Sequence, residues 1–127
     1  MYNYLLIAVG AACGGVLRFW ISGFVQKASP AGFPVGTLTV NVAGSFVLGF
    51  IIFAFNAREL ISPELKLMLT VGLCGGFTTF STFSYETIAL LQDSSYLLAL
   101  INISLNLFLT LFAVVLSYFL AKLITGG

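Results

Sequence analysis

Apolar residues fill this chain in four long blocks, and short polar segments separate them. The blocks cover about residues 2–25, 35–55, 67–91 and 96–121. An α-helix needs about 20 apolar residues to cross a bilayer, and each block provides that length. The connecting segments hold the three prolines and most of the charged residues. The pattern predicts an all-α membrane protein with four transmembrane helices, forming a single domain over residues 1–127.

The third block departs from this pattern in its second half. There Gly75 and Gly76 are followed by Phe-Thr-Thr-Phe-Ser-Thr-Phe-Ser, in which hydroxyl side chains are interleaved with aromatic rings. This stretch is too polar for lipid and too apolar for a soluble loop. Irregular backbone at membrane depth is tolerated only inside protein or beside a water-filled cavity. We therefore predict that the third helix is broken near residues 75–79 and that the break is the functional centre.

Composition narrows the class of protein. Hydrophobic residues make up 60% of the chain and charged residues 7%, whereas about 25% of residues are charged in soluble domains. A soluble globular protein is thereby excluded. The net charge of +1 provides no basic patch for nucleic acid. The sequence has no histidine, no pair of nucleophile and base, and no cluster of metal ligands, so we do not expect an enzyme.

The distribution of charge bears on how the chain inserts into the membrane. Four spans place both termini on one side, together with Arg58, Lys66 and Lys122. The other side carries Lys27, and also Arg18 if that side chain extends to the surface. Positive residues favour the cytoplasmic side, but the difference here is small. It is compatible with termini in the cytoplasm, and equally with a chain that inserts in both orientations and pairs head to tail.

Two other spans carry polar side chains on one helical face. Asn41 and Ser45 lie four residues apart in the second span, and Asn102, Asn106 and Thr110 repeat at the same interval in the fourth. Residues four apart share a face of a helix, and an unpaired polar group is costly to bury. Each row therefore either bonds a neighbouring helix or lines a pathway for a polar solute. The sequence alone is compatible with both.

Arg18 and Glu86 are the two charged residues inside the predicted spans. A guanidinium near the bilayer midplane is costly unless it is paired or reaches water. Arg18 either anchors the end of the first span or lies in an aqueous vestibule, where it would attract anions. Glu86 is either a buried carboxylate, as a proton-coupled transporter would need, or a partner at a helix end. Both alternatives stay open for each residue.

The broken segment offers ligands for two kinds of ion. Phe80 and Phe83 share a helical side, and the edge of an aromatic ring is electropositive. Ring edges, the hydroxyls of Ser81 and Thr82, and the NH2 of Asn41 would together surround a small anion without a fixed charge. The glycine break also frees backbone carbonyls, which suit Na+. The alternative is that the rings pack against neighbours and the hydroxyls bond carbonyls one turn back.

Three stretches of the sequence resemble the CrcB/Fluc family of small fluoride channels. They are Gly14–Phe19, Pro34–Asn41 and Gly75–Glu86. The third is long and highly specific, and the similarity in length and number of spans covers the whole chain. The resemblance implies a passive, fluoride-selective channel in the bacterial inner membrane that lowers cytoplasmic fluoride. It also implies an antiparallel, dual-topology homodimer with two pores around a central structural Na+.

The resemblance implies roles for individual residues as well. Phe80 and Phe83 would present ring edges to fluoride, and Asn41 would donate a hydrogen bond beside them. Gly75 and Thr78 would supply the carbonyl ligands of the Na+, which is structural and not transported. The fluoride pore would be completed by Ser81, Thr82, Asn102, Asn106 and Thr110, and the electropositive vestibule would be formed by Arg18.

Two other functions fit a four-span membrane protein. Small proton-coupled exporters of drugs or cations also form four-span, dual-topology dimers, but they need a membrane-embedded acid in the first span, and residues 2–25 contain none. A structural or accessory subunit would use its glycine faces for assembly only. In that case the polar residues of the second, third and fourth spans would tolerate apolar replacement.

Overall fold

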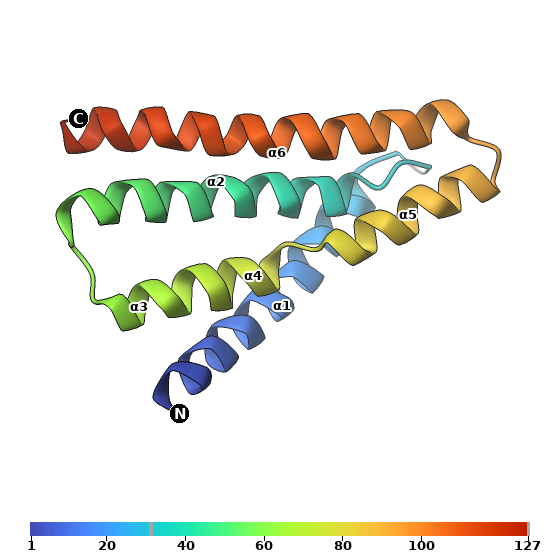
Figure 1. Ribbon diagram of the computed structural model, residues 1–127. Coiled ribbons are helices and arrows are strands. Elements are labelled where there is room, and N and C mark those ends of the chain that lie inside the picture. Colours follow the sequence, from blue (N-terminus) through green and yellow to red (C-terminus); the bar gives the residue numbers. More distant parts are fainter. Residues whose placement is uncertain (31, 127) are drawn as a thin grey trace.

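The computed structural model describes residues 1–30 and 32–126, with only the backbone of 57 and 58, and this part of the chain is helical without strands (Figure 1). The first two spans are α1 (Tyr2–Ala28) and α2 (Val35–Arg58). The third span is built from α3 (Pro63–Leu67), η1 (Met68–Cys74), α4 (Gly75–Phe77) and α5 (Phe80–Gln92), and the fourth is α6 (Tyr96–Thr125). The Arg58 side chain, which entered the comparison of charges above, lies outside the described part.

Four segments are long and apolar enough to cross a bilayer. They are Tyr2–Ala28, Val35–Asn56, Pro63–Gln92 and Tyr96–Thr125. The predicted all-α fold with four spans is confirmed, and the chain is a multi-pass membrane protein. The first and last helices continue past their predicted ends, to Ala28 and Thr125.

The third span is broken at the predicted place. Thr78 and Thr79 are extended, with φ/ψ of −90°/158° and −151°/113°, and a helix resumes at Phe80. Thr79 caps this new helix, because its hydroxyl oxygen accepts a hydrogen bond from the N–H of Thr82 at 3.2 Å. The turns before the break, Met68–Cys74, form a π-helix that the sequence did not predict. The span is therefore widened just before the point where it unwinds.

α1 crosses the first half of the third span at very close range. Gly10 and Gly14 are buried in this contact. A Cβ atom added to Gly10 would lie 2.4 Å from the carbonyl oxygen of Met68, and one added to Gly14 would lie 2.2 Å from that of Leu73. Small residues allow helix backbones in membranes to approach this closely. The glycines of α1 thus set the distance between α1 and η1.

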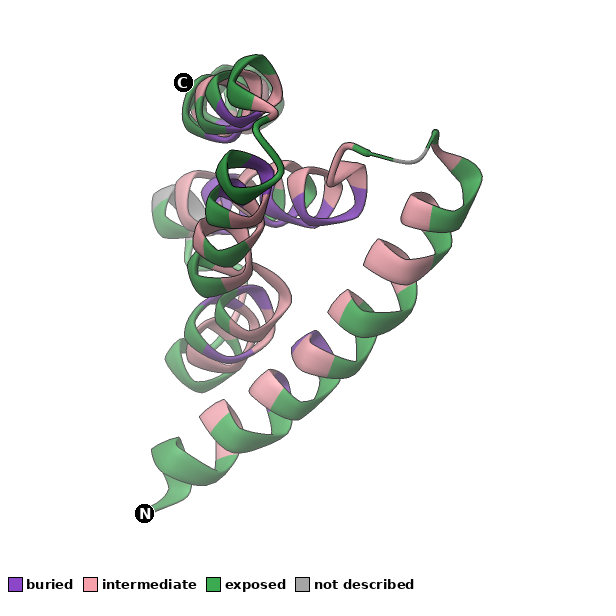
Figure 2. Cartoon of the chain, turned by 90° about the vertical axis from the view of Figure 1, so that its right-hand side faces the viewer, coloured by how far each residue is buried: buried purple, intermediate pink, exposed green. Residues whose placement is uncertain are grey.

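The core of the chain is made of small and polar residues. α6 lies beside α2 and runs in the same direction (Figure 1). Between them Ser117 is fully buried, and a Cβ atom on Gly49 would lie 2.2 Å from its hydroxyl oxygen. Large apolar side chains such as Phe19 and Trp20 are exposed, and Figure 2 shows that the outer faces of the helices are exposed as well. Lipid is as apolar as these side chains, so burying them inside the protein gains little.

We expect alanine to lower the stability of the folded protein at Gly14 and to raise it at the adjacent Gly15. Gly14→Ala places a methyl group against the Leu73 carbonyl, and such overpacking costs about 1–3 kcal/mol. At Gly15 an added Cβ meets nothing within 4 Å, so Gly15→Ala should gain about 1 kcal/mol of helix propensity. Unfolding of the purified protein in SDS, followed by circular dichroism, measures both changes. Equal stability of the two variants would contradict the close contact of α1 with η1.

Candidate functional site

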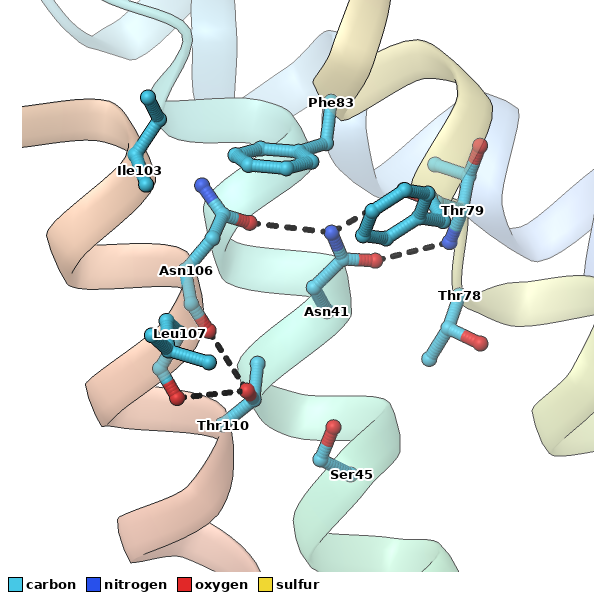
Figure 3. Close-up of a pocket in the computed structure, with 10 residues that line it drawn as sticks. Asn41, Ser45, Thr78, Thr79, Phe83, Ile103, Asn106, Leu107 and Thr110 are labelled. Carbon is cyan, nitrogen blue, oxygen red and sulfur yellow. Dashed lines mark hydrogen bonds between the residues drawn. The ribbon is translucent and has the colours of Figure 1, made fainter. Parts of the chain in front are cut away.

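A cavity of about 450 Å³ lies beside the break in the third span. Figure 3 shows side chains from α2, α6 and the broken segment converging on it. The lining residues are Asn41, Ser45, Thr78, Thr79, Phe80, Phe83, Ile103, Asn106, Leu107 and Thr110. None of these described residues is charged, and amides and hydroxyls stand beside aromatic and aliphatic groups. The cavity therefore suits a small solute held by neutral donors.

Asn41 joins α2 to the break through two hydrogen bonds and to α6 through a third. Its Oδ1 accepts from the N–H of Thr79 at 2.8 Å. Its Nδ2 donates to the carbonyl of Thr79 at 3.2 Å and to Oδ1 of Asn106 at 3.1 Å. Buried backbone groups need partners, and the unwound Thr79 finds both of its own in this one side chain. Asn41 is itself buried, so the contact is shielded from solvent.

The polar row of α6 is only partly in the cavity. Asn106 and Thr110 line it, whereas Asn102 does not. Asn102 is 1% exposed, and its Nδ2 donates to the hydroxyl of Thr87 in α5 at 3.0 Å. Along the helix, Nδ2 of Asn106 donates to Oδ1 of Asn102 at 3.0 Å, and the Thr110 hydroxyl donates to the carbonyl of Asn106. The row therefore joins α6 to α2 and α5 by hydrogen bonds, and part of it also lines the cavity.

Phe80 and Phe83 stand next to each other at the start of α5. Their ring centres are 5.3 Å apart and their planes are inclined by 55°. Figure 3 shows the Phe83 ring beside the amides of Asn41 and Asn106. Phe80 also lines the cavity, but it is 79% exposed. One side of the candidate site is therefore open at the surface of the single chain.

Ser81 and Thr82 belong to the cap of α5 and do not line the cavity. The Thr79 hydroxyl donates to Oγ1 of Thr82 at 3.0 Å, and it lies 3.4 Å from the hydroxyl of Ser81. Ser81 is exposed. The cap itself is the bond from the N–H of Thr82 to the Thr79 hydroxyl, and the exposed Ser81 hydroxyl makes the long contact at its edge. Both side chains lie outside the group around Asn41.

Among the backbone carbonyls at the break, those of Gly75 and Thr78 have lost their helical donors. In a continuous helix the N–H of Thr79 would bond the carbonyl of Gly75, and that of Thr82 would bond the carbonyl of Thr78. Here the first N–H goes to Asn41 and the second to the Thr79 hydroxyl. At the break, the N–H groups that would bond the carbonyls of Gly75 and Thr78 therefore bond other acceptors. These are the two carbonyls that the resemblance implied as Na+ ligands.

Arg18 lies beside the same break. Its Nε donates to the carbonyl of Gly76 at 3.0 Å, so α1 is tied to the third span by a side chain as well as by its glycines. The residue is half-buried and does not line the cavity. From the sequence we considered Arg18 as an anchor at the end of the first span or as part of a vestibule. Neither hypothesis predicted its hydrogen bond to Gly76.

Glu86 lies away from the cavity. It borders a second pocket of about 280 Å³ near the loop between α1 and α2, together with Gln26 and Asp93. Among the described residues, the carboxylate oxygen Oε1 is buried without a hydrogen-bond partner. Whether Glu86 is a buried carboxylate for proton coupling or a partner at a helix end, it lies in a pocket separate from the cavity at the break.

The model of one protein family, described as "CrcB-like protein, Camphor Resistance (CrcB)", matches residues 5–118. The chain belongs to this CrcB family. A protein from Sulfurovum sp. (strain NBC37-1), named "Fluoride-specific ion channel FluC", is 46% identical over 128 residues, which cover 99% of this chain and 100% of the relative. A protein of the same name from Shewanella sp. (strain W3-18-1) is 51% identical over 114 residues, 90% of this chain and 91% of the relative.

Membership of the CrcB family confirms the resemblance drawn from the three sequence motifs. With its four apolar helices, the CrcB chain is a multi-pass bacterial membrane protein. Three cavity residues were not singled out from the sequence, Thr79, Ile103 and Leu107, and neither was Thr87, which lies behind the cavity as the partner of Asn102. Thr79 carried a weak signal, because a threonine just before a resumed helix is a favoured cap. Thr87 carried none, since its partner Asn102 comes from another helix.

Removing the cap of α5 in this CrcB chain should weaken the fold at the break. Thr79→Ala deletes the hydroxyl that accepts from Thr82, and loss of such a cap costs about 0.5–2 kcal/mol. Ser81→Ala, at an exposed position of the same segment, is the matched control and should change stability little. Titration with SDS measures both free energies of unfolding. Equal effects of the two substitutions would contradict the capping role.

Proposed function

We propose that this chain is a fluoride-specific ion channel, through which fluoride leaves the cell passively so that its cytoplasmic concentration stays low. The observation that carries the proposal is the cavity at the break, whose described lining joins Asn41, Asn106 and the Phe83 ring without a charged side chain. The relatives carry the name of fluoride-specific ion channels. That name describes a channel, in agreement with the expectation that the chain is not an enzyme.

Neutral ligands suit an ion that has to be bound and then released. Fluoride is small and strongly hydrated, so a pore must replace its water with closely placed donors. The edges of Phe80 and Phe83 would present positive partial charge to it. Conduction also requires that the ion leave again. Ring edges and amides meet both needs, whereas an ion pair with a buried lysine or arginine would hold the ion too long.

The Asn41 amide has to exchange partners in order to donate to fluoride. Its Nδ2 already donates to two oxygen atoms, the carbonyl of Thr79 and Oδ1 of Asn106. A hydrogen bond to an ion is roughly twice as strong as one between neutral groups. Fluoride would therefore displace the longer bond, the one of 3.2 Å to Thr79, and that bond would form again when the ion moves on.

A second, inverted copy of the chain would complete the pore. Phe80, Gly75 and Ser81 are exposed at the break, so one wall of the ion path is open in the single chain. Polar groups and irregular backbone facing lipid are costly. The weak charge bias of the sequence allows insertion in either orientation. An antiparallel homodimer with a two-fold axis would cover both breaks and form two pores.

The freed carbonyls of Gly75 and Thr78 favour the proposal that a structural Na+ binds between the two copies. Carbonyl oxygens replace the water around small cations. The neighbouring carbonyl of Gly76 is engaged by Arg18, which leaves the other two for the metal ion. Bound in this way, Na+ would hold the two breaks together and would not pass through the channel.

Replacing either ring should slow fluoride transport while the protein stays assembled. Phe80→Ile and Phe83→Ile keep apolar bulk and remove the ring edge. Contacts of aromatic rings are worth ~0.5–1.5 kcal/mol, so each variant should lose up to about tenfold in flux. Phe108→Ile, at an exposed position of α6, is the matched control and should conduct normally.

A fluoride electrode outside liposomes that contain the purified protein measures this efflux, and a chloride electrode measures selectivity. Absence of fluoride flux in the unmodified protein, or equal flux of chloride, would contradict the channel. Unchanged fluoride flux in both phenylalanine variants would refute the ring-edge role and leave the channel itself standing.

Removal of Na+ should lower both stability and flux. A ligand that binds only the folded dimer stabilises it by ~2.7 kcal/mol at a hundredfold excess over its dissociation constant. We therefore expect earlier thermal unfolding and slower fluoride efflux when N-methyl-D-glucamine replaces Na+ at equal ionic strength. Identical unfolding and efflux in the two buffers would contradict a structural Na+.

A further inference from the structure

Three asparagines form a row of hydrogen bonds that all point the same way. Nδ2 of Asn41 donates to Oδ1 of Asn106 at 3.1 Å, and Nδ2 of Asn106 donates to Oδ1 of Asn102 at 3.0 Å. Nδ2 of Asn106 also donates to the backbone carbonyl of Asn102 at 2.9 Å. Each amide receives on its oxygen and donates from its nitrogen. Turning the middle amide over would set oxygen against oxygen on one side and NH2 against NH2 on the other. The row therefore fixes its orientation.

Both ends of the row lie in the third span. At one end the N–H of Thr79 donates to Oδ1 of Asn41 at 2.8 Å. At the other, Nδ2 of Asn102 donates to the Thr87 hydroxyl at 3.0 Å, and that hydroxyl donates to the carbonyl of Phe83 at 2.8 Å. The row leaves the break, passes through α2 and α6, and returns to α5. It thus connects the unwound backbone with the backbone of a cavity residue.

Stability alone is a weak reason for the polar side chains of Asn102 and Thr87. They are 1% and 7% exposed, and neither lines the cavity. Hydrogen bonds between helices in a membrane contribute little on average, while a polar group that loses its partner is expensive to bury. An apolar side chain would fill the same space without that risk. A polar side chain adds a second acceptor for the next amide, beside the backbone carbonyl of Asn102.

We propose that Asn102 and Thr87 are positioning residues that set the orientation of the Asn106 and Asn41 amides in the cavity. The consequence for transport rests on the proposed function, because the direction of each amide decides whether its NH2 or its oxygen faces the ion. Bonds in such a row also polarise one another. Loss of the Thr87 hydroxyl deprives the Asn102 amide of its acceptor and frees that amide to turn. Asn106 then keeps its bond to the backbone carbonyl of Asn102 and loses the bond to the side chain.

Thr87→Val tests the end of the row, where the change cannot touch the ion. It keeps the shape of the side chain and removes the hydroxyl. We expect fluoride efflux from liposomes to fall about fivefold, as the loss of one hydrogen bond gives. The side-chain NH2 signals of Asn41 and Asn106 in the 15N NMR spectrum should shift at the same time. Thr87→Ser retains the hydroxyl and should restore both efflux and signals.

Thr70→Val is the matched control. Thr70 is buried in the same span, and its hydroxyl donates to the carbonyl of Lys66 one turn back. This substitution removes an equally buried hydroxyl outside the row, so it should leave the two NH2 signals and the efflux unchanged. A shift as large as that in Thr87→Val would show that the signals report general loosening, and would overturn the proposal.

Asn102→Leu interrupts the same row from α6 and replaces Thr87→Val if that variant does not fold. NH2 signals of Asn41 and Asn106 that stay in place would overturn the proposal, whether or not efflux falls. The 15N NMR signals can be recorded whether or not the protein transports fluoride, so they test the positioning role separately from the proposed function. If the unmodified protein carries no fluoride, the proposed function fails, while shifted signals would still support the positioning role.

Discussion

A helix broken at membrane depth leaves backbone groups that neither lipid nor a neighbouring turn can satisfy. Asn41 meets this need, because its oxygen accepts from the N–H of Thr79 and its nitrogen donates to the carbonyl of the same residue. The amide supplies, from another helix, the partners that the third span has given up. This pair of bonds ties α2 to the break, and Asn41 and Thr79 line the cavity together with the Phe80 and Phe83 rings.

Features that depend on local chemistry could be predicted from the sequence. The length of the apolar blocks was enough to predict four spans. The break could be predicted from Gly75 and Gly76, which precede a hydroxyl-rich stretch. The spacing of Asn102, Asn106 and Thr110 placed them on one helical face, and hydrogen bonds one turn apart join them along α6. The spacing did not tell which of them would reach the cavity, because that depends on how α6 is rotated against α2 and α5.

Features that depend on distant partners could not be predicted. Asn41 of α2 reaches the backbone N–H of Thr79, and Asn102 of α6 reaches the hydroxyl of Thr87. Neither contact is marked by the sequence of the third span itself. Arg18 bonds a carbonyl 58 residues away, so no spacing along its own helix indicates the contact. The π-helix Met68–Cys74 consists mainly of ordinary apolar residues, with one threonine and one glycine, and no residue type in it marks the wider turn.

In the proposed channel, the charge of Arg18 would act on the ion without binding it. Its Nε engages the Gly76 carbonyl, and the residue does not line the cavity. The proposed Na+ at Gly75 and Thr78 would place a second positive charge at the same break. A unit charge about 8 Å away still contributes ~2 kcal/mol at an effective dielectric constant of ~20, which is enough to draw an anion toward a neutral cavity. Because neither cation would touch the ion, no ion pair has to break each time fluoride moves on.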